Sequence, residues 1–319
     1  MFGRGLRVLA SVGHGVLPLA SSRIRGVDHP IELPPLDIPQ LLKEFGIHPD
    51  KSLGQHFLAD PGSLQRVVEI ASLTGTEEVL EIGAGLGSLT RLLAVHARRV
   101  VAVEIDQGLI QALTRVLEIT RNIEIVQGDI LELDPTQLFS TSGYLVVANI
   151  PYYITSAIVR HLMEAEVRPG RIVLTVQREV AERITAVPGS MSLLSLSVQV
   201  YGDPVIAGRI SAEAFYPVPR VESAIVRIDL LDEPRIPAPD LPAFFYLAKI
   251  TFSQKRKKIR NSLASLPGVD PSRAESLLMA AGIPPDRRPE TLGLDEWEAL
   301  VRVCRENLVG TPLSAPGDK

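Results

Sequence analysis

The chain has 319 residues, with 33 lysines and arginines against 37 aspartates and glutamates, so its formal net charge is −4. This length is enough for about two domains, and 45% hydrophobic with 22% charged residues is typical of folded globular proteins. No apolar stretch approaches the roughly 18 residues of a membrane span, and one cysteine with six scattered histidines predicts neither an internal disulfide nor a zinc site.

Residues 1–35 are expected to precede the folded protein as a leader. The first 27 contain four arginines and no acid, the bias of a transit peptide, and the apolar stretch 8–20 faintly resembles the core of a signal peptide. Glycines and a proline interrupt that stretch, and a disordered leader or a gene start placed too early explains the composition more simply. We therefore expect a cytoplasmic protein, with organellar import through residues 1–27 as the lesser alternative.

Helices and strands are expected to alternate from residue 38 onward. The expected helices are 38–45, 62–73, 86–95, 109–118 and 154–165, and the expected strands are 79–82, 100–105, 123–126, 144–150 and 172–176. Short strands made almost entirely of Val, Ile and Leu indicate a parallel sheet with both faces covered. From 192 to 230 apolar and polar residues alternate around a turn expected at 202–204, which predicts an antiparallel extension of the sheet.

The last quarter of the chain is expected to form a separate, all-helical domain. A proline-rich stretch at 233–242 is typical of a linker, and helices are expected at 244–252, 256–264, 271–281 and 295–306. The predicted division is therefore a catalytic domain at 36–232, the linker, a helical domain at 243–308 and a tail at 309–319. Trp297 and Cys304 are expected to be core residues of the last helix.

Three glycines join the strand expected at 79–82 to the next helix. Gly83, Gly85 and Gly87 let the backbone turn tightly and approach a ligand, and the helix N-terminus offers free N–H groups. This spacing occurs in dinucleotide-binding folds, in methyltransferases and in simple tight turns. Dinucleotide binding usually needs Gly-x-Gly-x-x-Gly, and here the third glycine comes one residue early, which favours the phosphate-free ligand S-adenosylmethionine.

Acids follow the glycines at the ends of neighbouring strands. Glu104 lies 21 residues after Gly83, where a carboxylate can accept hydrogen bonds from ribose hydroxyls. Asp129 ends the next strand at the same carboxyl edge of the sheet, where it suits the amine of adenine. The role of Glu81 stays open at this point, because it could order the glycine loop or face solvent. Glu104 and Asp129 could themselves be two solvated acids, but the cofactor interpretation is favoured.

The fourth expected strand ends in Asn149-Ile150-Pro151-Tyr152. An adenine amine is a poor nucleophile, because its lone pair is delocalised into the ring. The Asn149 side-chain oxygen and the Ile150 carbonyl could accept its two hydrogens and free the lone pair, while Pro151 fixes the turn and Tyr152 stacks on the base. The alternative is a proline turn with core tyrosines. With the glycine loop and both acids, the sequence resembles N6-adenine methyltransferases.

Three further segments narrow the resemblance. They are residues 51–58 (KSLGQHFL), 215–224 (FYPVPRVESA) and 252–263 (FSQKRKKIRNSL). In this order they resemble the Gly-Gln-Asn/His-Phe-Leu segment, the Phe-x-Pro-x-Pro-x-Val-x-Ser segment and the basic C-terminal helix of the ribosomal RNA adenine N6-dimethyltransferases. The resemblance covers about residues 38–305 and is greatest to the bacterial, small-subunit branch of that family.

This resemblance implies a fold and a set of site residues. The fold is α/β, a class I (Rossmann-like) S-adenosylmethionine-dependent methyltransferase with a small all-helical C-terminal domain. His56 and Leu58 are implied to contact the methionine end of the cofactor with Gly83 and Gly85, and Phe215 to face the target base opposite Tyr152. Many relatives carry Asn at the position of His56. A neutral imidazole can also donate one hydrogen bond and accept another.

A basic run is expected to bind RNA. Five of the six residues from 255 to 260 are basic, namely Lys255, Arg256, Lys257, Lys258 and Arg260. Such a run is usually a solvated helix face, but beside a site for an extruded adenine it is expected to contact phosphates, with Arg220 extending the surface.

The implied reaction is N6,N6-dimethylation of two adjacent adenosines near the 3′ end of small-subunit (16S) ribosomal RNA, in an immature 30S subunit. We expect a monomer without metal or membrane attachment. Two alternatives stay open: a large-subunit methyltransferase of the macrolide-resistance type, and an RNA-binding assembly factor whose methylation is dispensable.

Overall fold

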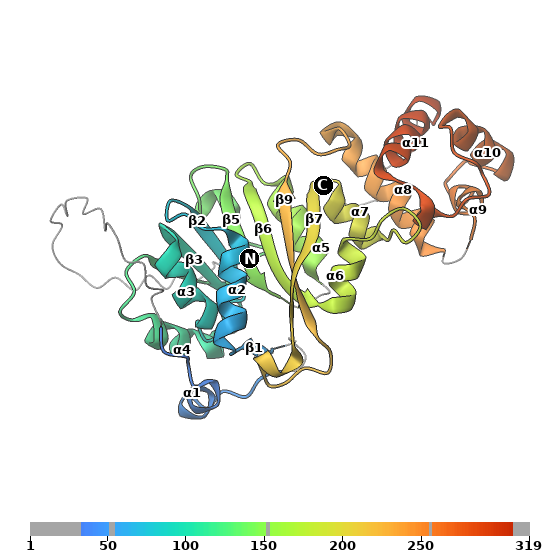
Figure 1. Cartoon of the computed structure of the whole chain (residues 1–319). Coiled ribbons are helices and arrows are strands. Elements are labelled where there is room, and N and C mark those ends of the chain that lie inside the picture. Colours follow the sequence, from blue (N-terminus) through green and yellow to red (C-terminus); the bar gives the residue numbers. More distant parts are fainter. Residues whose placement is uncertain (1–32, 51–54, 151–153, 255–256, 309–319) are drawn as a thin grey trace, which may run out of the picture.

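The computed structural model describes residues 33–50, 55–150, 154–254 and 257–308. Its centre is a seven-stranded sheet with the order β4-β3-β2-β5-β6-β9-β7 (Figure 1). The strands are β2 (Glu78–Ile82), β3 (Arg99–Glu104), β4 (Ile123–Gln127), β5 (Tyr144–Asn149), β6 (Pro169–Gln177), β7 (Gly202–Ile210) and β9 (Ser223–Leu230). The first five are parallel, whereas β9 and β7 join antiparallel. This mostly parallel sheet confirms the expected α/β class.

Helices cover both faces of the sheet. They are α2 (Pro61–Ala71), α3 (Ser88–His96), α4 (Gln107–Leu117), α5 (Thr155–Glu164), α6 (Arg178–Ile184) and α7 (Leu193–Gln199). A further helix, α1 (Ile38–Glu44), lies off the sheet and packs with Phe57 and α4 (Figure 1). Successive strand residues point to opposite faces. Val79 of β2 therefore packs with α2 and α3, whereas its neighbour Leu80 packs with α5, and both side chains are fully buried.

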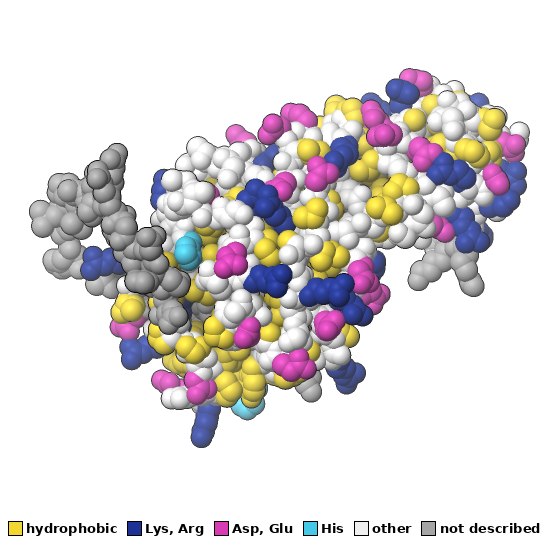
Figure 2. All heavy atoms as spheres, viewed as in Figure 1, with side chains coloured by type: hydrophobic (Ala, Val, Ile, Leu, Met, Phe, Trp, Pro, Cys, Tyr) yellow, Lys and Arg dark blue, Asp and Glu magenta, His cyan; other side chains and the backbone are white. Residues whose placement is uncertain are grey.

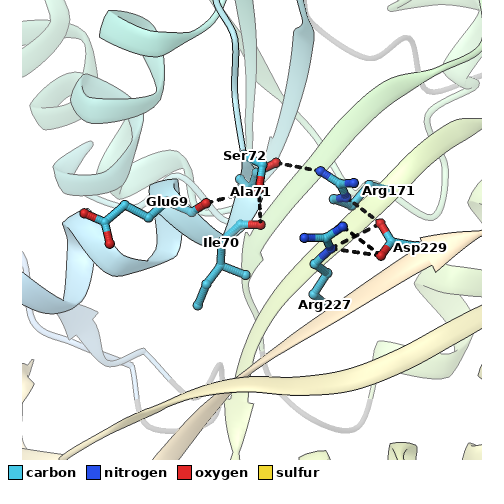
Figure 3. Close-up of polar contacts among 7 residues, drawn as sticks. All are labelled: Glu69, Ile70, Ala71, Ser72, Arg171, Arg227 and Asp229. Carbon is cyan, nitrogen blue, oxygen red and sulfur yellow. Dashed lines mark hydrogen bonds and ion pairs between the residues drawn. The ribbon is translucent and has the colours of Figure 1, made fainter.

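An ion-pair network ties the end of α2 to the sheet (Figure 3). Arg171 of β6 donates from Nη1 to the carbonyl of Ala71 at 3.1 Å and from Nε to Asp229 Oδ1 at 2.6 Å. Arg227 donates from Nε to the other oxygen of Asp229 at 2.9 Å. Because the last carbonyls of a helix have no partner within it, Arg171 satisfies a group that would otherwise need water. Burial acts to raise the pKa of Asp229, but the hydrogen bonds from Arg227 and Arg171 lower it overall.

One expected strand is a helix. The alternating residues of 194–200 lie mostly in α7, because Ser192 and Ser195 form a capping box in which each side chain bonds the other's backbone N–H. Ser195 is as fully buried as Leu196, so the alternation did not mark an inner and an outer face. The turn expected at 202–204 is also wrong, since these residues begin β7. The antiparallel extension itself is present, formed by β7 and β9.

The C-terminal part is helical, as expected. It contains α8 (Leu241–Ser253), α9 (Ile259–Leu263), α10 (Pro271–Ala280) and α11 (Leu294–Asn307). Trp297 and Cys304 are fully buried core residues, as predicted. Their apolar cluster is continuous with the core on the α5 side of the sheet, and α7 packs against α8. The proline-rich stretch before α8 is itself packed, because Ile236 is fully buried and Arg235 pairs with Asp203 at 2.6 Å.

Candidate functional site

A cavity of about 630 Å³ opens at the carboxyl ends of the parallel strands. Most of the site residues predicted from the sequence line it, namely His56, Gly83, Gly85, Glu104, Asp129, Asn149, Ile150 and Phe215. Tyr152 and Pro151 lie outside the described residues. Leu58 is buried in the core beside Phe215 and does not line the cavity, so its cofactor contact remains a prediction.

The glycine loop is packed too tightly for side chains. At Gly85 the backbone is left-handed (φ 59°), and a Cβ would lie 3.2 Å from the ring of Phe57. At Gly87, also left-handed, a Cβ would lie 3.0 Å from Leu113 of α4. Glycine is therefore required by both conformation and space. Gly83 and Gly85 line the cavity without a side chain, and their N–H groups bond the carbonyl of Val103 at 2.9 Å and Glu104 Oε2 at 2.7 Å.

Two backbone hydrogen bonds fix the carboxylate of Glu104 in the site. It ends β3, is 4% exposed and accepts backbone N–H bonds at both oxygens, from Gly85 at 2.7 Å and from Asp106 at 2.9 Å. A carboxylate has about four acceptor positions, so capacity for two ribose hydroxyls remains. Burial raises the pKa of Glu104 although these hydrogen bonds oppose the shift.

Glu81 is buried rather than solvated, which removes one of the two alternatives left open by the sequence. Its side chain on β2 is 2% exposed, and Oε2 has no hydrogen-bond partner among the described residues. Burial, helped by the charge of Glu104, raises the pKa of Glu81 to about 8. Glu81 does not line the cavity, and its raised pKa favours the protonated form.

Asp129 and Asn149 each keep an acceptor toward a ligand. Asp129 Oδ1 accepts the backbone N–H of Leu131 at 2.9 Å, and Oδ2 has no donor among the described residues. Asn149 ends β5 and donates from Nδ2 to the carbonyl of His56 at 3.1 Å. That bond uses the amide's donor side and leaves Oδ1 as an acceptor, as the predicted chemistry requires.

Residues just before α2 line the cavity together with the Phe-x-Pro-x-Pro-x-Val-x-Ser segment at 215–224. Strands β1 (Phe57–Leu58) and β8 (Phe215–Tyr216) form a two-stranded sheet in which Leu58 pairs with Phe215. His56 Nδ1 lies 2.7 Å from the carbonyl of Pro217, so Nδ1 donates its proton to that carbonyl and leaves Nε2 for another partner. Phe215, 4% exposed, lines the cavity on this side.

Sequence reasoning missed polar residues on the far wall of the cavity. Gln177 at the end of β6 and Ser223 at the start of β9 are register partners, and both line the cavity with Thr175. Gln177 follows a strand expected to end at 176. The reasoning that selected Glu104 and Asp129, a polar side chain at the carboxyl end of a parallel strand, could therefore have selected Gln177 too. Ser223 is the serine of the Phe-x-Pro-x-Pro-x-Val-x-Ser segment.

The helix expected at 256–264 is present but begins later, and of the described basic residues only Arg260 lies in it. Helix α8 ends at Ser253 and α9 begins only at Ile259, whose side chain is fully buried and whose N–H is bonded by the carbonyl of Arg287 at 2.8 Å. Lys257 and Lys258 precede α9 and are exposed. Burying Ile259 therefore sets the start of the helix, and Lys257 and Lys258 lie before it on what we call the basic connection.

The two other described cations that are predicted to contact RNA differ in whether an acid already pairs with them. Arg260 pairs with Glu275 at 3.1 Å, whereas Arg220 is exposed beside Pro219, which lines the cavity. Lys255 and Arg256 lie outside the described residues. Figure 2 shows basic and acidic side chains interspersed on the face viewed, which agrees with the small net charge. Any RNA-binding surface is therefore local.

Neither a membrane helix nor a metal site is found in the part of the chain that the structure describes. No helix there is long and apolar enough to cross a bilayer. No group of three or more His, Cys, Asp or Glu side chains there could hold a metal ion.

The sequence is similar to known ribosomal RNA methyltransferases. The sequence model of the ribosomal RNA adenine dimethylase family matches residues 48–297. Ribosomal RNA small subunit methyltransferase A of Dehalococcoides mccartyi is 40% identical, over 84% of this chain and 92% of its own length. The protein of the same name from Pelotomaculum thermopropionicum is 39% identical, over 83% of this chain and 95% of its own.

Solved structures agree with this similarity. The 23S rRNA methyltransferase ErmE has a TM-score of 0.60 and 31% identity, covering 77% of this chain and 98% of its own. A dimethyladenosine transferase from Plasmodium falciparum has a TM-score of 0.66 and 24% identity, covering 79% and 98%, and shows likeness of fold alone. These similarities confirm the expected class I methyltransferase fold. The chain belongs to the ribosomal RNA adenine dimethylase family.

Proposed function

We propose that this protein transfers methyl groups from S-adenosylmethionine to N6 of two adjacent adenosines near the 3′ end of small-subunit ribosomal RNA. The observation that carries the proposal is the position of Asn149. Asn149 lines the same cavity as Glu104 and Asp129, and the bond from its Nδ2 to His56 leaves Oδ1 as an acceptor, so one cavity offers both a nucleoside-binding wall and an acceptor for an amine. The family membership and the small-subunit relatives support the substrate.

The cofactor half of the cavity fits S-adenosylmethionine. Glu104 would accept the ribose hydroxyls and Asp129 Oδ2 the adenine amine, while the bare backbone around Gly83 and Gly85 leaves room for the methionine end. His56 would accept the ammonium through Nε2. Bound there, S-adenosylmethionine supplies an electrophilic methyl group, whose bond to sulfur breaks as the bond to N6 forms.

The residues on the other side orient the target base. Asn149 Oδ1 and the Ile150 carbonyl accept hydrogen bonds from the two N6 hydrogens, which reduces delocalisation of the nitrogen lone pair into the ring. Phe215 and Tyr152 stack on the two faces of the base. Gln177 is placed to contact an edge of the base or of its neighbour. Most of the rate is expected from this positioning, and the N6 proton leaves to water after transfer.

The second methylation sets an additional demand on the same residues. A monomethylated amine keeps one N–H, so only one of the two acceptors at Asn149 and Ile150 can bind a hydrogen in the second step. The cavity must then accommodate the first methyl group where the other hydrogen had been. The polar wall at exposed Gln177 and buried Ser223 is the side on which we place that methyl group.

RNA binding and organisation complete the proposal. We assign residues 36–232 to catalysis and 243–308 to RNA binding, with Lys257, Lys258 and Arg220 as the phosphate contacts among the described residues. The protein would act as a monomer in the cytoplasm and serve small-subunit biogenesis.

The test is to incubate the protein with labelled S-adenosylmethionine and immature small subunits, and to map the label by primer extension and mass spectrometry. We expect N6,N6-dimethyladenosine at two adjacent positions near the 3′ end of the RNA. Large subunits in a parallel reaction should stay unlabelled. Label on the large subunit alone would overturn the proposed substrate.

A further inference from the structure

A side-chain hydrogen bond joins two segments of the cavity wall that are far apart in the sequence. Gln55, in the segment before β1, donates from Nε2 to Asp106 Oδ2 at 2.7 Å, across 51 residues of chain. Both side chains are half-buried, and Gln55 lines the cavity. Neither residue has a role in the reaction as described so far.

The bond belongs to a chain of hydrogen bonds that ends at the glycine loop. Asp106 donates its backbone N–H to Glu104 Oε1 at 2.9 Å, and Glu104 Oε2 accepts the N–H of Gly85 at 2.7 Å. Asp106 Oδ1 also caps α4 by accepting the N–H of Gly108 at 2.8 Å. Gln55 is therefore connected through Asp106 to the acid that is placed to hold the ribose.

The orientation of the Gln55 amide is fixed by its partners on both sides. The backbone N–H of Asp50 donates to Gln55 Oε1 at 2.8 Å. This bond requires an oxygen at that position, and the carboxylate of Asp106 requires a donor at the other. Only a neutral amide in this one orientation satisfies both neighbours.

We infer that Gln55 is a positioning residue for S-adenosylmethionine, which holds His56 and its segment against the ribose-binding loop at Glu104 through its bond to Asp106. We refer to the Gln55–Asp106 bond as the clasp. The inference rests on the proposed cofactor roles of His56 and Glu104. The clasp keeps the two sides of the cofactor wall in register before the cofactor binds, so binding does not have to order them.

A cofactor-positioning role has a kinetic signature. Loss of the clasp should weaken cofactor binding, because the free protein must then order the segment itself. Once the cofactor is saturating, the wall is ordered and turnover should return. Gln55→Ala is therefore expected to raise the KM for S-adenosylmethionine by about tenfold, with kcat changed less than about twofold.

The sharper variant is Gln55→Glu, which changes only the charge and one donor. It places a second carboxylate oxygen about 2.7 Å from Asp106 Oδ2. Two carboxylates at this distance cannot both stay ionised without repulsion, whereas one shared proton restores a hydrogen bond. Relative to the unaltered protein, this variant should bind S-adenosylmethionine at least tenfold more weakly at pH 8 and should recover most of the difference near pH 5.5.

A second substitution should rescue the first. In Gln55→Glu combined with Asp106→Asn, the introduced asparagine can donate to the introduced glutamate while its oxygen still caps α4. The glutamate still accepts the N–H of Asp50. Every partner of the clasp is satisfied again with donor and acceptor exchanged. The double variant should therefore bind within about threefold of the unaltered protein, without the pH dependence of the single variant.

The experiment is isothermal titration with S-adenosylmethionine at pH 5.5 and 8 of four proteins: the unaltered protein, Gln55→Glu, Asp106→Asn and the double variant. Thermal unfolding of each protein is recorded without cofactor. Gln111→Glu, an exposed glutamine on α4, controls for added charge and should bind normally. Equal binding by Gln55→Glu and the unaltered protein at pH 8, or no rescue by the double variant, would overturn the clasp while leaving the proposed function in place. No binding by the unaltered protein would overturn both.

Discussion

The charged residues at the edge of the sheet are held in a different way from those on the helical part. Glu104 is 4% exposed and accepts two backbone hydrogen bonds, whereas Lys257 and Lys258 are exposed and have no ion pair among the described residues. The first arrangement fixes a geometry, and the second only supplies charge. Substitutions at the edge should therefore have large effects that hardly depend on salt, while those on the basic connection should have small effects that salt removes.

The largest effect is expected at the junction with the target base. Asn149→Ala removes the acceptor that acts mainly on the reacting amine, so it should lower kcat by on the order of a thousandfold while cofactor affinity stays within about tenfold. Single-turnover kinetics and titration with S-adenosylmethionine measure the two quantities. Asn149→Asp keeps an acceptor oxygen and should retain part of the activity. Unchanged turnover in Asn149→Ala would remove Asn149 from the mechanism.

The next effect concerns the cofactor wall alone. Glu104→Gln has one acceptor oxygen instead of two and sets an NH₂ group against a backbone N–H of Gly85 or Asp106. Cofactor affinity should fall by about 10- to 100-fold, at low and high salt alike. Calorimetry at two salt concentrations tests this, with exposed Glu132→Gln as the control that should bind normally. A loss that disappears in high salt would show that the contact is only electrostatic.

A smaller effect is expected on the basic connection. Replacing Lys257 and Lys258 together by Gln should weaken RNA binding and reduce the slope of log K against log salt by about 0.7 for each lost phosphate contact. Filter binding of a small-subunit RNA fragment over a salt series measures the slope. Lys43→Gln on α1 provides the control outside the helical part. If the double variant keeps the full slope, these lysines do not contact phosphate.

The smallest effect is on stability and concerns the buried acid Glu81. The pKa of Glu81 is raised from 4.5 to about 8 by burial. The folded state therefore holds a proton that the unfolded chain releases above about pH 4.5, so stability falls as pH rises from there to about 8 and then levels. Glu81→Gln removes this decline and should raise Tm by a few degrees at pH 9 and less at pH 5. A Tm difference between Glu81→Gln and the unaltered protein that stays constant from pH 5 to pH 9 would contradict the raised pKa.

Local sequence patterns predicted the parallel part of the sheet well. Strands β2 to β6 were found to within a few residues, because each contains a short run rich in Val, Ile and Leu. The strand-end rule also brought Glu104, Asp129 and Asn149 to one edge, since parallel strands end on the same side. Thus the part of the site that depends on backbone register could be derived from the sequence.

The remaining features depend on contacts between distant segments. Strands β1 and β8 pair across more than 150 residues, and the Gln55–Asp106 bond joins residues 51 apart, so no local period reveals them. Ser195 and Ser197 are polar but buried in α7, which made a helix look like a strand. The composition of the basic run suits a helix, and a helix was expected at 256–264. In the structure that helix begins at Ile259, whose side chain is fully buried.

The central claim is that one cavity at the sheet edge holds the methyl donor on one wall and the adenine amine on the other. A crystal structure with S-adenosylhomocysteine, the product of the donor, tests this most directly. We predict its ribose hydroxyls on Glu104, its adenine amine on Asp129 and its sulfur facing the Asn149 turn. A ligand bound elsewhere, or one whose sulfur points away from that turn, would contradict the account.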